Sequence, residues 1–111
     1  DKNSNSGVFF RCLNPVTIND KNCYEANIFD NRPDQSGRTG GIVHTAAPTQ
    51  IIQTEGKWNT YVIKAFGENL VIALNGVVTV ETKDSSHMAG PIALQFAGGG
   101  IKFRNITLES L

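Results

Sequence analysis

The chain has 111 residues, of which ten are basic and ten acidic, so its formal net charge at neutral pH is zero. This balance excludes a global field that would hold the protein on a nucleic acid or an anionic membrane, and neither is an expected partner. The length predicts a single domain over residues 1–111 with a moderate core. No apolar run approaches the roughly 18 residues that a membrane-spanning helix needs.

Apolar residues alternate with a period of two along most of the chain, and no stretch repeats with the period of a helix over three turns. The pattern therefore predicts an all-β protein. In chain order, we expect strands at 7–13, 23–29, 41–45, 59–66, 70–74, 77–82, 92–96 and 101–109. Many short antiparallel strands separated by turn residues are typical of a β-sandwich or barrel.

The first expected strand, GVFFRCL, ends in a charge. Alternation places Phe9 and Arg11 on one face and Val8, Phe10 and Cys12 on the other. Arg11 thus lies apart from the apolar residues that would build the core. This arrangement indicates that one face of the strand is polar.

The second expected strand, CYEANIFD, carries further polar groups. Glu25, Asn27 and Phe29 share one face by the same counting. If the two strands are neighbours, Arg11 could reach Glu25 or Asp30, and this row of donors and acceptors suits the hydroxyl groups of a sugar. The alternative is a solvated cross-strand ion pair that contributes less than about 1 kcal/mol.

The two cysteines, Cys12 and Cys23, stand eleven positions apart at the inner ends of these strands. If the strands pair as a hairpin, the two side chains can face each other and form a disulfide. A pair of buried free thiols is the alternative.

The strongest local signal is LVIALNGVVTVE, in which Asn75-Gly76 suits a type I′ turn between two apolar strands. Because both faces are largely apolar, we expect this hairpin in the middle of a sheet. A two-residue turn predicts the pairs Leu74 with Val77, Ala73 with Val78, Ile72 with Thr79 and Val71 with Val80. Near the C-terminus the apolar parity switches at Arg104-Asn105, which predicts a β-bulge.

Three other side chains are candidates for a site, each with a simpler structural reading. His44 is either a base or a satisfied strand histidine. Gln95 either faces solvent or lies in the same groove as Glu25. Trp58 is either a platform for a sugar ring or a core residue. The chain shows no zinc-ligand spacing, phosphate-binding loop or nucleophile elbow, so we expect neither a metal nor a cofactor.

Several segments in order resemble the 3-keto-disaccharide hydrolase family, long classed as a domain of unknown function. They are NSGVFFR, YEANIFD, TGGIV, WNTYVIKAFGENLVIALNG, GPIALQ and IKFRNITLESL. The resemblance implies a concanavalin A-like jelly-roll sandwich, as in laminarinase-type glucanases and legume lectins. Family members carry further strands before the NSG motif, so we expect a missing N-terminal segment or a second copy of the chain to complete the sandwich.

The resemblance also implies a carbohydrate ligand and an enzyme that cleaves glycosides oxidised at the third sugar carbon, by elimination and hydration. It implies a bacterial protein of the periplasm or the cell exterior. The roles that it suggests are a base at Glu25 or His44, an enolate-stabilising group at Arg11, hydroxyl-binding groups at Asn27, Asp30 and Gln95, and a platform at Trp58. The alternatives are a non-catalytic carbohydrate-binding module and a structural or interaction sandwich.

Overall fold

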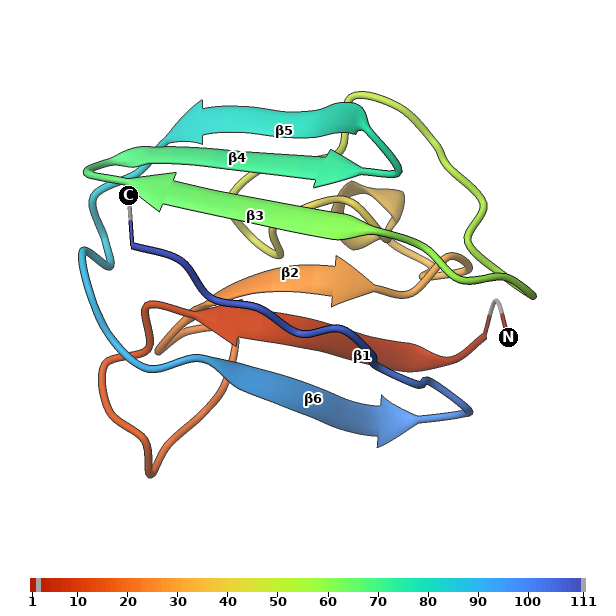
Figure 1. Ribbon diagram of the computed structural model, residues 1–111, viewed down its shortest axis with the longest axis horizontal. Helices are drawn as coiled ribbons and strands as arrows, with labels where there is room; N and C mark the ends of the chain where they lie inside the picture. The colour runs from red at the N-terminus through yellow and green to blue at the C-terminus, as the bar shows by residue number, and fades with distance from the viewer. Residues whose placement is uncertain (2, 111) are drawn as a thin grey trace.

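The structure is a computed structural model that describes residue 1 and residues 3–110. Its elements are β1 (Asn5–Phe10), β2 (Tyr24–Ile28), the 3₁₀ turn η1 (Gln35–Gly37), β3 (Tyr61–Phe66), β4 (Asn69–Leu74), β5 (Val77–Lys83) and β6 (Ala93–Gly98). The strands form two antiparallel three-stranded sheets, ordered β2-β1-β6 and β3-β4-β5, which lie as two layers in Figure 1. The all-β prediction is confirmed. In the described part of the chain, no helix is long and apolar enough to span a membrane.

The main core lies between the two sheets and follows from the alternation in β1 and β2. Phe10 and Tyr24 point from the first sheet toward the second, with ring centroids 5.4 Å apart. The completely buried members of this cluster are Ala26, Ile42, Leu70 and Ile72. Burial of each large apolar side chain contributes roughly 1.5–3 kcal/mol, so this cluster is the main source of stability between the layers.

A smaller cluster covers the opposite face of β1. Phe9 packs there against the disulfide between Cys12 and Cys23, with Ile18 and Ala93 at its margin. The disulfide is formed, with a Cα–Cα distance of 4.1 Å, so the prediction of a bridge is confirmed. It closes residues 12–23 into a loop, named here the disulfide loop, which folds over the outer face of the first sheet.

The expectation of a strand at 41–45 is wrong. Ile42 makes only isolated bridges, to Ala26 and Ala46. The chain turns back at this point because His44 has a φ of 62°, so Ala46 N donates to Ile42 O at 2.9 Å. A residue in the left-handed region cannot continue a pleated strand.

The expectations of a strand at 101–109 and of a bulge within it are also wrong. This segment follows β6 and crosses the front of the molecule without a strand partner in the described residues (Figure 1). The guanidinium of Arg104 lies 3.8 Å from the ring centroid of Trp58. Asn105 has a φ of 54°, so the parity switch marks a bend in an extended segment and not a bulge in a ladder.

The hairpin between β4 and β5 agrees with the prediction at its turn. Asn75 and Gly76 have φ values of 52° and 81°, as a type I′ turn requires. Leu74 pairs with Val77 and Ala73 with Val78, as expected. β4 is central, but β5 lies at the edge of the described sheet, so the expectation of a wholly central hairpin is only half right.

Beyond the second pair, the predicted register is wrong by one residue. Ile72 pairs with Val80 and not with Thr79, and Val71 consequently pairs with Glu81. Thr79 is the extra residue of a β-bulge, and its hydroxyl donates to Gly40 O at 2.7 Å. The bulge makes two consecutive residues buried, which strict alternation does not allow.

Some apolar side chains on the sheets remain uncovered by the described residues. Leu94 and Phe96 of β6 are 44% and 83% exposed, and Phe66 of β3 is 65% exposed. Exposed apolar area of this kind is common at interaction surfaces. Completion of the sandwich by a further segment or a second copy stays a prediction.

Candidate functional site

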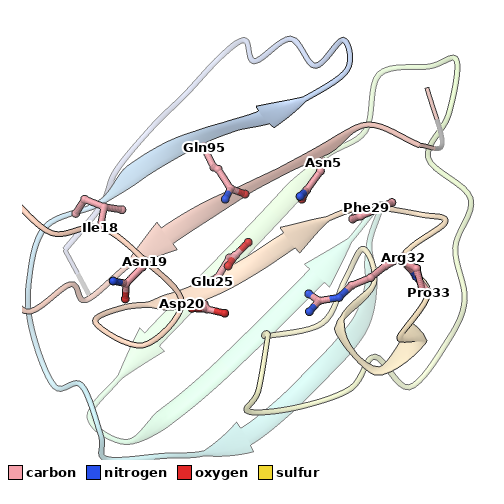
Figure 2. Close-up of a pocket in the computed structure, with 9 residues that line it drawn as sticks. All are labelled: Asn5, Ile18, Asn19, Asp20, Glu25, Phe29, Arg32, Pro33 and Gln95. Atoms are coloured by element: carbon pink, nitrogen blue, oxygen red, sulfur yellow. The ribbon is translucent and has the colours of Figure 1, made fainter.

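A hollow of about 430 Å³ lies on the outer face of the first sheet, within the roughly 300–1,000 Å³ typical of small-molecule sites. Adjacent strands supply its floor: Asn5 from β1, Glu25 from β2 and Gln95 from β6 (Figure 2). The residues that line it are Asn5, Ile18, Asn19, Asp20, Glu25, Phe29, Arg32, Pro33 and Gln95. The first sheet therefore has one face for the core and one for the hollow.

Glu25 occupies the middle of this floor because Gly7 lies beside it on β1. A Cβ atom on Gly7 would lie 3.2 Å from Glu25 Oε1 and 3.2 Å from Ala26 O. A glycine inside a strand often marks such a close approach. Gly7 thus leaves the space into which the Glu25 side chain fits.

Glu25 is only 7% exposed although it borders the hollow. Burial raises the pKa of Glu25 from 4.5 to about 7, and the negative charge of Asp20 adds to the increase. Arg32 and His44 oppose it with positive charge. A carboxyl group with a pKa near neutrality is well suited to accept and return a proton.

The disulfide loop forms one wall of the hollow. It carries Ile18, Asn19 and Asp20 (Figure 2), and Asn19 Oδ1 accepts the Asn22 N–H at 2.8 Å within the same loop. Asp20 Oδ2 lies 2.9 Å from Nε2 of His44, so His44 stands at the rim. The disulfide closes this wall, and the exposed contact between Asp20 and His44 links it to the turn at residues 42–46.

The segment after β2 forms the opposite wall with Phe29, Arg32 and Pro33. Arg32 Nη1 lies 3.4 Å from Gly37 O, to which it donates, and the guanidinium points toward the centre of the hollow in Figure 2. Its charge acts on Glu25. Arg32 thus supplies the positive group that was expected from Arg11.

Arg11 does not join Glu25 or Asp30, so the expected contact is wrong. β1 ends at Phe10, and Arg11 has a φ of 51°, which turns its side chain to the other side of the sheet. There its guanidinium donates to the carbonyl groups of Gly67 and His87. The same turn moves Cys12 to the face of Phe9, opposite to the expectation.

Asp30 lies outside the hollow and organises the loops beneath it. Its carboxylate accepts hydrogen bonds from the Thr39 hydroxyl and from the N–H and hydroxyl of Thr54, and Arg38 Nη2 lies 3.8 Å away. Burial alone would raise the pKa of Asp30, but these hydrogen bonds and then the Arg38 charge outweigh it and lower the pKa. Asp30 therefore acts as a structural hub.

Asn27 and Trp58 also lie outside the hollow. Asn27 is 1% exposed, and its Nδ2 donates to Gly37 O beneath η1. Trp58 is half exposed, but Arg104 covers one face of its ring. Gln95, in contrast, lines the hollow, and its buried Oε1 has no hydrogen-bond partner among the described residues.

The structure therefore brings together Glu25 and Gln95 of the expected site residues, with His44 at the rim. The sequence does not reveal the contributions of Asp20 and Arg32, or those of Asn5 and Asn19, whereas alternation places Phe29 on the face of Glu25 without a role in the site. The signal that could have revealed the loop wall was the cysteine pair, because its closure returns residues 12–23 to the sheet. No group of three potential metal ligands occurs among His, Cys, Asp and Glu side chains of residues 1 and 3–110.

Comparisons with known proteins agree with this architecture. A family model described as "3-keto-alpha-glucoside-1,2-lyase-like domain" matches residues 1–109. A solved structure of a "Putative glycosyl hydrolase from Parabacteroides distasonis ATCC 8503" is similar, with 25% identity and a TM-score of 0.64. The match covers 73% of this chain and 45% of that chain, so it spans less than half of the neighbour, and it confirms the sandwich fold. Among curated proteins, none matches.

Proposed function

The chain belongs to the 3-keto-α-glucoside-1,2-lyase-like family, and from this premise we propose that it cleaves 3-keto-glycosides by elimination followed by hydration. The family and the structural neighbour together indicate a glycosyl hydrolase-like function at the coarser level. The observation that supports the finer proposal is the buried carboxyl group of Glu25, whose pKa of about 7 suits a base, at the centre of a polar hollow.

A ketone at the third sugar carbon makes the hydrogen on the second carbon acidic. Glu25 removes this proton and leaves an enolate. Arg32 stabilises the negative oxygen, because its guanidinium points toward Glu25 from the opposite wall. The enolate then re-forms the ketone, a double bond forms between the first and second carbons, and the bond to the aglycone breaks. The hydroxyl group of a water molecule bonds to the first carbon and the other proton of that water goes to the aglycone oxygen. Glu25 returns its proton to the second carbon, which completes the hydrolysis.

The remaining lining residues hold the sugar ring. The amides of Asn5, Asn19 and Gln95 offer donors and acceptors for hydroxyl groups. A sugar hydroxyl would satisfy the buried Oε1 of Gln95. Phe29 provides an apolar surface for the C–H face of the ring. This assignment replaces Arg11, Asn27, Asp30 and Trp58 with residues that border the hollow.

The disulfide supports an oxidising compartment, because such bonds form and persist outside the cytosol of most organisms. We therefore place the protein in the periplasm or on the exterior of a bacterial cell.

The test is to incubate the protein with a methyl 3-keto-glucoside and follow methanol release and the absorbance of the enone intermediate. We expect turnover that increases with pH through about 7, in step with ionisation of Glu25. Glu25→Gln should lose at least about a hundredfold in kcat, while Glu81→Gln, an exposed control on β5, should retain activity.

Unchanged turnover in Glu25→Gln would reject this residue as the base. Binding of the keto-sugar by the wild-type protein without any turnover would support the alternative of a carbohydrate-binding module. Binding is measured by the increase in unfolding temperature with sugar concentration.

A further inference from the structure

Asn27 lies behind the hollow, two residues along β2 from Glu25, and one atom of its amide has no partner. Its Nδ2 donates to Gly37 O, which also accepts from Arg32 Nη1 at 3.4 Å. Because a carbonyl oxygen can only accept, this contact decides which end of the Asn27 amide is the nitrogen. The other end, Oδ1, is buried and has no hydrogen-bond partner within residues 1 and 3–110. A buried amide oxygen of this kind needs a donor.

The sheet register leaves a space beside Asn27 on the face that it shares with Glu25. Gly7 of β1 is the pairing partner of Asn27. The backbone of Asn27 bonds to Gly40 and Gly41 on its other side, so Asn27 and Gly7 form a non-hydrogen-bonded pair. In such a pair the Cα atoms lie about 4.5 Å apart and the side chains approach closely. Since Gly7 has no side chain, this space is open to another group.

The carboxyl group of Glu25 occupies the space over Gly7. A Cβ atom on Gly7 would lie 3.2 Å from both Cγ and Oε1 of Glu25. The direct partner of Glu25 on β1 is Phe9, so the Glu25 side chain leans along the sheet toward the pair of Gly7 and Asn27. Figure 2 shows the same carboxyl group directed toward β1. Gln95, the partner of Gly7 on β6, has a second buried amide oxygen that no described residue contacts as a donor.

These surroundings suit a neutral carboxyl group. An ionised carboxylate can only accept hydrogen bonds, whereas a protonated one has an O–H that can donate to an amide oxygen. A hydrogen bond to the neutral form therefore acts in the same direction as burial. The charged groups that act on Glu25 are Asp20 of the disulfide loop, Arg32 of the segment after β2 and His44 of the turn at residues 42–46. β1 and β6 carry no charged residue.

We propose that Asn27 is a positioning residue, whose Oδ1 accepts a hydrogen bond from the neutral carboxyl group of Glu25 and holds its proton in the resting site. The use of this contact in catalysis rests on the proposed function, in which Glu25 must first lose that proton to water before it can act as a base. Asn27 thus sets the pH above which the base is available, although it does not touch the sugar.

The hydrogen bond is tested first in the wild-type protein without substrate, by NMR titration. The ¹³Cδ signal of Glu25, identified by its absence in Glu25→Gln, reports the ionisation of the carboxyl group. The ¹³Cγ signal of Asn27 should titrate with the same midpoint, because its oxygen loses a donor at that pH. The ¹³Cγ signal of Asn105, which is exposed, serves as the control and should not follow this midpoint. A constant Asn27 signal across the midpoint would overturn the proposal.

Asn27→Leu separates the hydrogen bond from burial. Leu keeps a buried side chain of similar size but has no acceptor, so the midpoint of Glu25 should fall by about half to one pH unit, which corresponds to one neutral hydrogen bond. Burial alone predicts the opposite direction, because Leu makes the surroundings more apolar. Asn69→Leu, the same change at an exposed position of β4, should leave the midpoint unchanged. An unchanged or higher midpoint in Asn27→Leu would reject the role of Asn27.

The link to catalysis is tested with a methyl 3-keto-glucoside. The increase of kcat with pH should move to lower pH in Asn27→Leu by the same amount as the NMR midpoint. A shift in the NMR midpoint without a matching shift in kcat would show that the contact does not control the base. If the wild-type protein turns over no keto-sugar, the proposed function fails, while the NMR titrations still decide whether the hydrogen bond exists.

Discussion

The most direct test of the electrostatics at the hollow is the effect of Glu25→Gln on stability. In the folded protein the pKa of Glu25 is about 7, compared with an ordinary value of 4.5. The stability that comes from burying the neutral carboxyl group of Glu25 is therefore fully present below pH 4.5. It is lost as the pH increases from 4.5 through 7, because the folded state must then ionise a buried group that the unfolded state ionises freely. Gln has nearly the same shape and no charge to bury.

The expected size of the effect follows from the difference between the two pKa values. At about 1.4 kcal/mol per pKa unit, the charged form of Glu25 costs the fold roughly 3 kcal/mol above pH 7. The free energy of unfolding of Glu25→Gln, relative to that of the wild type, should therefore increase by roughly 3 kcal/mol between pH 4.5 and pH 8. The charged neighbours Asp20, Arg32 and His44 are present in both proteins.

The measurement is urea unfolding of both proteins at pH 4.5, 6 and 8, followed by circular dichroism. Glu81→Gln serves as the matched control, because it makes the same chemical change at an exposed position of β5 that does not line the hollow. A difference between Glu25→Gln and wild type that does not change with pH would refute the buried-carboxyl reasoning, whatever the effect on activity. Stabilisation combined with lost turnover would be the usual compromise at an active site.

Three further changes test other parts of the structure. Thr79→Val removes the donor to the carbonyl of Gly40 and should lower the free energy of unfolding by about 1–3 kcal/mol in urea, whereas no loss would contradict the bulge contact. Alanine at both cysteines opens the 12–23 loop and should cost about 3 kcal/mol by loop entropy, and an unchanged unfolding midpoint would contradict this. Gly7→Ala should displace the Glu25 carboxylate and lower kcat about tenfold or more with an unchanged circular dichroism spectrum, and full activity would show that the space is not needed.

The parts of the fold that alternation could predict are those inside paired strands. Alternation predicts the correct face for Glu25 and Gln95 because both lie within ladders, where a period of two decides the direction of each side chain. Counting failed for Arg11, which follows the last paired residue of its strand and has a positive φ that nothing in its side chain indicates. It also failed at Thr79, because a bulge depends on a contact with a distant loop.

The parts of the candidate site that could not be predicted come from loops. Asp20 reaches the hollow because a disulfide folds its loop over the sheet, and Arg32 does so because its loop is held in place below by Asp30. Such paths depend on contacts distant in sequence and leave no periodic pattern. Residues 101–109 show the opposite problem, because they alternate like a strand without a described neighbour to pair with.

The two-sided use of the first sheet also bears on how such a protein can evolve. Adjacent positions such as Glu25 and Ala26 face different constraints, one from a ligand and the other from the interior. A mutant library restricted to Asn5 and Gln95 could therefore explore new sugar preferences while thermostability is conserved. Selection for a new substrate would not have to compromise the interior that keeps the two layers together.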